Sequence, residues 1–169
     1  MTVLGSPVCD ARELAAQVTD PEMPMLTLAD LGVLREVKVE GDRVRVVITP
    51  TYSGCPALAT MRDDLVRVLT TAGYAAVDVV VALAPAWSSD WITERGRAAL
   101  QAHGLSAPGP APRRTGPVVL DLGPTRRDVA CPRCGSGEVV LASEFGPTAC
   151  TALYRCRACA EPFQHVKEI

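Results

Sequence analysis

The strongest constraint on the fold is a closely spaced pair of cysteines that occurs twice near the C-terminus. The two pairs, CPRC at 131–134 and CRAC at 156–159, give the pattern C-x2-C-x21-C-x2-C. Each pair supplies two thiolates from one tight turn, and four thiolates make the tetrahedral site that Zn²⁺ prefers. We therefore predict a zinc ribbon with four metal ligands: Cys131, Cys134, Cys156 and Cys159. Iron in a rubredoxin-like site uses the same ligands and is the alternative occupant.

The segment around these cysteines is too short to be stable without its metal. A unit of about 40 residues buries too little apolar surface to fold unaided, so metal binding and folding should be one event. Cys150 and His165 lie outside the ligand pattern, and neither is expected to bind the ion. The ribbon strands are expected at 139–143, 152–155 and 163–166.

Proline and glycine divide the chain into two parts. The segment SAPGPAPRRTGP at 106–117 contains four prolines and two glycines, a composition typical of a semi-rigid linker. We therefore predict an α/β domain at 1–105, a linker at 106–117 and a zinc-ribbon domain at 118–169.

Hydrophobic periodicity in the first part predicts a small α-β-β-α-β sandwich. Valines alternate with polar residues on either side of Gly41-Asp42, which indicates an antiparallel hairpin. A β-branched run, VDVVVAL, indicates a more buried third strand. The expected elements are a helix from Asp10 to about Val18, strands at 33–39 and 43–49, a helix from Pro56, a strand within 74–84 and a helix at 89–103 that Gly104 ends.

Cys55 is the most interesting residue outside the ribbon. It immediately precedes Pro56, which suits the first position of a helix, so its sulfur is predicted at the N-cap. Unpaired amides and the helix dipole stabilise a thiolate there, and a thiolate can bind a soft metal or attack an electrophile. The alternative is a buried, unreactive capping cysteine. The acidic loop residues Asp20, Glu22 and Asp30 either face Cys55 or are solvated surface carboxylates.

Several classes of function lack support in the sequence. Residues 1–105 carry nine basic and thirteen acidic side chains, and residues 106–169 carry eight and six, so neither part is basic enough to indicate nucleic-acid binding. No histidine lies near Cys55 in sequence, and there is no nucleotide-binding loop or Glu-x-x-His diiron motif. The first residues have no signal-peptide pattern and no apolar run spans a bilayer, so we expect a cytoplasmic protein that does not enter membranes.

Five segments together resemble the PaaD family of phenylacetate-degradation proteins, and the likeness covers nearly the whole chain. The first part also resembles the small domain of SufT and of the cytosolic iron–sulfur targeting factors, whose signature joins a D-P-E-x-P turn to a T-x-T-x-x-x-C-P loop. Ala160 departs from the glycine that commonly follows the second cysteine pair. The matching segments are DPEMP at 20–24, DLGVL at 30–34, ITPTYSGCPA at 48–57, WSSDWITERGR at 87–97 and CRACAEPF at 156–163.

The resemblance implies a non-catalytic accessory protein that matures a metal centre of the multicomponent phenylacetyl-CoA ring-epoxidising monooxygenase. The centre is either diiron or an iron–sulfur cluster, and the partners are the monooxygenase components. Cys55 is then the functional thiol, transiently holding iron or a cluster fragment, with Asp20, Thr49 and Thr51 lining its pocket. A homodimer across two Cys55 residues, or thiolates of the client, must supply further ligands.

Two other functions remain as alternatives at this stage. One is a structural subunit of the monooxygenase complex, and the other is a zinc-ribbon nucleic-acid-binding module, which the charge balance disfavours. Trp87 and Trp91 are predicted either to pack the last helix or to form an exposed edge for a partner.

Overall fold

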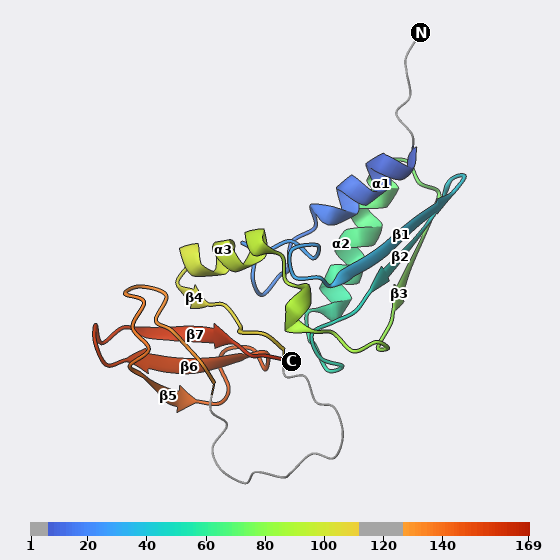
Figure 1. Ribbon diagram of the computed structural model, residues 1–169. Helices are drawn as coiled ribbons and strands as arrows, with labels where there is room; N and C mark the ends of the chain where they lie inside the picture. Colours follow the sequence, from blue (N-terminus) through green and yellow to red (C-terminus); the bar gives the residue numbers. More distant parts are fainter. Residues whose placement is uncertain (1–6, 112–126) are drawn as a thin grey trace. The chain divides into compact units, whose positions relative to one another are not determined.

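The computed structural model describes residues 7–111 and 127–169 (Figure 1). Contacts divide the chain into two compact units, Met1–Trp87 with Trp91–Ala99, and Ser88–Asp90 with Leu100–Ile169. Most of the predicted linker, 112–117, and the first residues of the predicted ribbon, 118–126, lie outside the described residues. No helix in the described ranges is long and apolar enough to cross a membrane.

The first unit has the predicted α-β-β-α-β order. Figure 1 shows that α1 and α2 lie against the same face of a three-stranded sheet. The strand order is β1-β2-β3, so β2 is central and both other strands are edges. The elements are α1 (Pro7–Ala16), β1 (Leu34–Glu40), β2 (Arg43–Ile48), α2 (Leu58–Thr71) and β3 (Ala76–Val81).

Turn chemistry and crossover length explain the pairing of these strands. Gly41 adopts a positive φ of 64° between β1 and β2, which pair antiparallel as the hairpin pattern predicted. β2 and β3 pair parallel, and α2 supplies the crossover that parallel neighbours need. The apolar side chains of β2 that alternate toward the helices are Val44, Val46 and Ile48, all buried.

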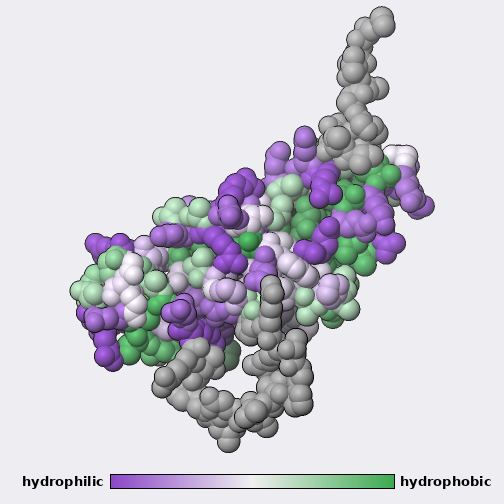
Figure 2. All heavy atoms as spheres, viewed as in Figure 1, coloured by the Kyte–Doolittle hydropathy of each residue, from purple (hydrophilic) through white to green (hydrophobic). Residues whose placement is uncertain are grey.

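Aliphatic side chains from the helices, the sheet and the 18–33 loop build the core of this unit. Leu65 and Leu69 of α2 are fully buried at helical spacing, and the loop adds further leucines. The core therefore depends mainly on Leu and Val, in a chain in which only 4% of the residues are aromatic. On the face drawn in Figure 2, polar side chains predominate and apolar ones form separate patches. The leucines contributed by the loop are Leu26, Leu28 and Leu31.

The predicted helix at 89–103 is interrupted, so its predicted start was wrong. A short 3₁₀ turn, η1 (Ser89–Trp91), precedes α3 (Glu94–Ala102). The side-chain hydroxyl of Thr93 accepts a hydrogen bond from the Gly96 amide at 3.0 Å, so Thr93 caps α3 and fixes its first residue. Gly104 has a positive φ of 77° just beyond α3, as expected of a helix terminator.

The second unit contains a four-stranded sheet of order β4-β7-β6-β5. The three predicted ribbon strands are confirmed within one residue, as β5 (Val139–Ser143), β6 (Thr151–Cys156) and β7 (Pro162–Val166). No sequence pattern indicated β4 (Leu105–Ser106), which pairs parallel with β7. The predicted linker therefore begins inside a strand.

Candidate metal centre and thiol loop

The four predicted ligands converge on one point. All four Sγ atoms lie within 4.8 Å of one another, with 3.8 Å between Cys131 and Cys159 and 3.6 Å between Cys134 and Cys156. A regular tetrahedron with Zn–S bonds of about 2.3 Å has S–S edges of about 3.8 Å. The donor set and its dimensions therefore fit a tetrahedral thiolate site for zinc.

Two matching turns present these thiols. The Cys131 amide donates to the Ser136 carbonyl at 2.9 Å, and in the same way the Cys156 amide donates to the Glu161 carbonyl at 2.9 Å. The residue after each pair, Gly135 or Ala160, has a positive φ, of 73° and 62° respectively. Ala160 thus holds the left-handed conformation that glycine adopts without strain. The departure from the family pattern leaves the turn intact at a modest energetic cost.

The thiols differ in acidity. Backbone amides of Cys159 and Ala158 donate to Cys156 and lower the pKa of its thiol to about 7. The Ser136 amide lowers the pKa of Cys134, but desolvation and hydrogen bonding with the other thiols outweigh it and raise this pKa to about 12. Four thiolates this close repel one another, so a divalent cation is needed to ionise all of them.

Two of the four ligands also belong to the apolar core of the second unit. Cys131 and Cys156 are buried in the core, whereas Cys134 is exposed. The core is therefore built partly around the metal site. Its buried members are Val129, Cys131, Ala152, Tyr154, Cys156 and Phe163.

His165 and Cys150 lie outside the described cluster of four cysteines, as predicted. His165 is fully buried and its ring bridges two side chains, with Nδ1 3.1 Å from Ser106 Oγ and Nε2 3.0 Å from Glu168 Oε1. Burial raises the pKa of Glu168, but hydrogen bonds from His165 and the Gly109 amide outweigh burial and lower it to about 2. These hydrogen bonds connect β4 with β7 and with Glu168 near the C-terminus. No sequence motif predicted them.

Cys55 lies in the loop between β2 and α2, and its predicted N-cap position is wrong. Ala57 is the N-cap residue, and no side chain caps the helix. A turn precedes the helix, because the Cys55 amide donates to the Tyr52 carbonyl at 3.2 Å and the Leu58 amide donates to the Cys55 carbonyl at 3.3 Å. Pro56 is accordingly not the first helical residue. Cys55 is partly exposed, so it is not a buried cysteine.

Asp20 organises the D-P-E-x-P turn. Its Oδ1 accepts hydrogen bonds from the Glu22 and Met23 amides at 2.7 and 2.9 Å. Its side chain is buried, and desolvation raises its pKa despite these two bonds. Asp20 is therefore not a solvated surface carboxylate.

Backbone hydrogen bonds connect the start of the thiol loop, residues 49–57, with Val18, two residues before this turn. The Thr49 amide donates to the Val33 carbonyl at 2.8 Å, Val33 donates to Leu28 at 2.9 Å, and Leu28 donates to Val18 at 2.8 Å. Thr49 is buried, and Thr51 is partly exposed two residues further along. The two halves of the family signature are thus parts of one hydrogen-bonded frame.

Asp30 is held by residues distant in sequence rather than by solvent. Arg95 Nε lies 2.8 Å from its Oδ1, and the Thr93 hydroxyl lies 3.0 Å from the same atom. Desolvation raises the pKa of Asp30, but hydrogen bonds with Thr27, Thr93 and Arg95 outweigh it and lower the pKa. Asp30 thereby anchors the 27–33 loop to the start of α3.

Trp87 and Trp91 pack against the same 27–33 loop that Asp30 anchors. Trp87 is buried and its indole N–H donates to the Leu31 carbonyl at 2.9 Å, so packing, not an exposed edge, explains this residue. The Arg35 guanidinium lies 3.6 Å above the Trp91 ring centre. A Cβ at Gly32 would lie 2.5 Å from that of Trp91, which explains the glycine.

Comparison with known proteins matches both units. Residues 115–167 match the model of the PaaD zinc β-ribbon domain, and residues 10–82 match the model of iron–sulfur cluster assembly proteins. Over 166 residues the chain is 42% identical to a protein of Escherichia coli (strain K12) that is provisionally named as one of the subunits of 1,2-phenylacetyl-CoA epoxidase, covering 98% of this chain and 96% of the relative.

Two solved structures are also similar, each with a TM-score of 0.48. A domain of unknown function, DUF59, from Bacillus anthracis is 26% identical and matches 53% of this chain and 86% of that one. A conserved hypothetical protein from Thermotoga maritima is 21% identical and matches 58% and 96%.

Proposed function

Because the chain belongs to the PaaD family, we propose that it is a non-catalytic accessory protein that matures the metal centre of a phenylacetyl-CoA epoxidase. The centre served is an iron–sulfur cluster or a diiron site of the enzyme, and the work takes place in the cytoplasm. One observation carries the proposal. A partly exposed thiol, Cys55, lies in a loop of the domain that matches iron–sulfur cluster assembly proteins.

The frame around this loop supports a defined position for Cys55. The loop leaves β2 at Thr49, whose amide is bonded to the 27–33 segment, and that segment is fixed by Asp30 and Arg95. Sites on rigid elements hold a ligand more reproducibly than sites on free loops. In this proposal Asp20, Thr49 and Thr51 line the pocket of Cys55, and the buried carboxyl of Asp20 gains from a cation nearby because burial raises its pKa.

The cargo is iron or a fragment of an iron–sulfur cluster, held transiently. Clusters commonly take about four protein ligands, so one thiolate cannot hold a cluster alone. Thiolates of the client supply the rest. The zinc ribbon has a separate role, because its four thiols already complete a tetrahedral site, and it serves to dock the client.

The test is to produce the epoxidase components together with this protein or with Cys55→Ser. We expect the variant to fold and to keep its zinc, because Cys55 is outside the four-cysteine cluster, while the iron and acid-labile sulfide of the purified client fall several-fold. Ser53→Ala is the matched control, since Ser53 is exposed in the same loop. A client with full iron and sulfide in the Cys55 variant would refute the role of this thiol.

A structural subunit of the epoxidase is the second candidate, favoured by the name of the Escherichia coli relative. It predicts co-purification with the enzyme at fixed stoichiometry. It also predicts that removing this chain after assembly abolishes epoxidation without changing the metal content. A maturation factor gives the opposite result, because a client that has already received its metal stays active alone.

A further inference from the structure

The two edges of the three-stranded sheet differ in how they are protected against strand pairing. β1 has a bulge between Leu34 and Glu36, and a Glu36–Lys38 ion pair of 2.7 Å. Bulges and charged side chains are the usual protection of an edge strand. β3 has the sequence AVDVVV, with a single charge, no proline and no bulge in its pairing with β2. The edge at β3 is therefore open to strand addition.

The backbone of β3 has the groups that an added strand requires. The Ala82 amide donates to the Ile48 carbonyl, so even-numbered residues bond to β2 and odd-numbered ones point away from it. The outward residues include Val77 and Val79. In the described part of the chain no strand pairs with this side of β3.

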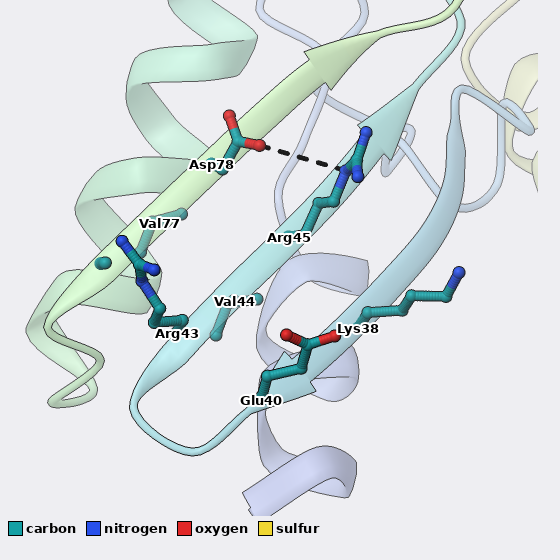
Figure 3. A pocket seen from close by; sticks show the side chains of 8 residues that line it. Lys38, Glu40, Arg43, Val44, Arg45, Val77 and Asp78 are labelled. Carbon is teal, nitrogen blue, oxygen red and sulfur yellow. Dashed lines mark ion pairs between the residues drawn. The ribbon is translucent and has the colours of Figure 1, made fainter.

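The charges beside this edge indicate which strand is added. On the sheet face away from the helices, Arg43 lies opposite Ala76, and Arg45 lies opposite Asp78 (Figure 3). The side chain of Arg43 makes no hydrogen bond or ion pair with any described residue, and Figure 3 shows it directed toward β3. Asp78 is 71% exposed and 4.0 Å from Arg45, so it retains capacity for a second cation. These residues line a cavity of about 500 Å³.

We propose that a second copy of this chain pairs with β3 through its own β3, antiparallel and centred on Val77. In this register Asp78 of each copy lies opposite Ala76 of the other. Because Ala76 has only a methyl side chain, the guanidinium of Arg43 reaches over it, across two strand spacings of about 4.8 Å each, to Asp78 of the second copy. Each Asp78 then lies between its own Arg45 and the Arg43 of the other chain.

Symmetry and charge select this arrangement. Two identical strands related by a two-fold axis pair antiparallel, and the contact is self-complementary. A register with Asp78 opposite Asp78 places like charges together, which is destabilising. A register centred on Val79 places Asp78 opposite Val80 and leaves Arg43 without a partner. Only the register centred on Val77, of the three compared, pairs the side chain of Arg43 with that of Asp78 in the other copy.

The dimer has a consequence for the thiol loops. Ile48, the last residue of β2, lies opposite Val81, so the loop to Cys55 leaves from that end of the sheet. In a pair centred on Val77 the two Val81 residues are eight positions apart, or about 27 Å. Two Cys55 thiols of one dimer therefore do not share a cluster. The dimer itself does not depend on the proposed function.

The test measures the molar mass of the zinc-loaded full chain by light scattering over a range of micromolar concentrations. We expect a dimer whose dissociation constant rises at least tenfold in Arg43→Glu and in Asp78→Arg. Both side chains are on the exposed face, so these variants should fold. The double variant R43E/D78R should recover most of the lost affinity. Lys38→Glu is the control, since it changes a charge on the same face but on β1.

Three outcomes would overturn the proposal. The first is a chain that is monomeric at every concentration, and the second is a dimer that Arg43→Glu leaves unchanged. The third is a monomeric chain that binds an epoxidase component and loses that binding in Arg43→Glu, because the edge then receives a strand of the client. Failure of the Cys55 test leaves the dimer in place, so the two proposals fail separately.

Discussion

The two units of this chain are stabilised in different ways. In the first, α2 and the 18–33 loop pack leucines against the valines of β2, and the described core consists of apolar side chains, none of which belongs to the four-cysteine cluster. In the second, two of the six buried core residues are metal ligands themselves, Cys131 and Cys156. Coordination thus replaces the apolar burial that a unit this small lacks. The comparison yields four predictions.

Removal of zinc should have the largest effect and should unfold only the second unit. Structural zinc sites contribute on the order of 10 kcal/mol to the free energy of folding. This exceeds the total stability of a small ribbon domain, so the domain cannot stay folded without the ion. Both tryptophans, Trp87 and Trp91, belong to the first unit, so their fluorescence should persist under a strong chelator. The ring signals of Tyr154 and Phe163 should lose their dispersion in NMR spectra. A ribbon that stays folded without metal would contradict the comparison.

Leu65→Ala should destabilise the first unit and leave the second unit unchanged. Leu65 is fully buried in α2, and truncating such a leucine costs about 3 kcal/mol. Urea unfolding followed by tryptophan fluorescence should show the loss, while zinc content stays at one ion per chain. Val66→Ala is the control, because Val66 is 39% exposed on the same helix and should cost less than about 0.5 kcal/mol.

Glu168→Gln should destabilise the second unit by roughly 1–2 kcal/mol at neutral pH, after allowing for solvent screening. The pKa of Glu168 falls from 4.5 to about 2 on folding, so its contribution is complete above pH 4.5 and disappears as the pH falls toward 2. Chemical unfolding at saturating zinc should therefore show a difference from the wild type that is constant at pH 6 to 8, a range in which the thiolates keep their zinc. Exposed Glu138→Gln should show no such difference.

Ala160→Gly should have the smallest effect, a stabilisation of the second unit by about 0.5 kcal/mol. Glycine relieves the strain of the positive φ at this turn, but it also gives the unfolded chain more freedom, which offsets part of the gain. Competition with a zinc chelator is the measurement. Ala158→Gly is the control, because Ala158 does not have a positive φ and should gain nothing. Equal gains at both positions would exclude the strain explanation.

Local signals predicted much of the fold. The alternation of valines around Gly41 indicated the hairpin, and the cysteine spacing indicated both the ribbon strands and the metal ligands. These features depend on residues that are neighbours in sequence or that obey a fixed ligand geometry. The order of elements in the first unit followed from hydrophobic periodicity in the same way, although α1 begins at Pro7, three residues before the predicted start at Asp10.

Long-range contacts account for what sequence reasoning missed. The Asp30–Arg95 ion pair joins residues 65 positions apart, so no local pattern indicates it. The two-residue strand β4 is too short for any periodicity. The misplaced start of α2 has a local cause, because Pro56 suits a helix start and also suits the turn that precedes one. Thr93 before Glu94 was a capping signal that could have located the start of α3.

The strand β4 has a practical consequence for dissecting this protein. The ribbon family model begins at residue 115, downstream of β4, so a fragment cut at that boundary loses the strand that covers one edge of β7. It also loses Ser106 and Gly109, which bond to His165 and Glu168. In such a fragment the buried His165 ring keeps only one of its two hydrogen-bond partners. The edge of β7 that β4 covered becomes exposed, and an exposed strand edge promotes aggregation. A fragment that starts at Leu100, where the second unit resumes, keeps both.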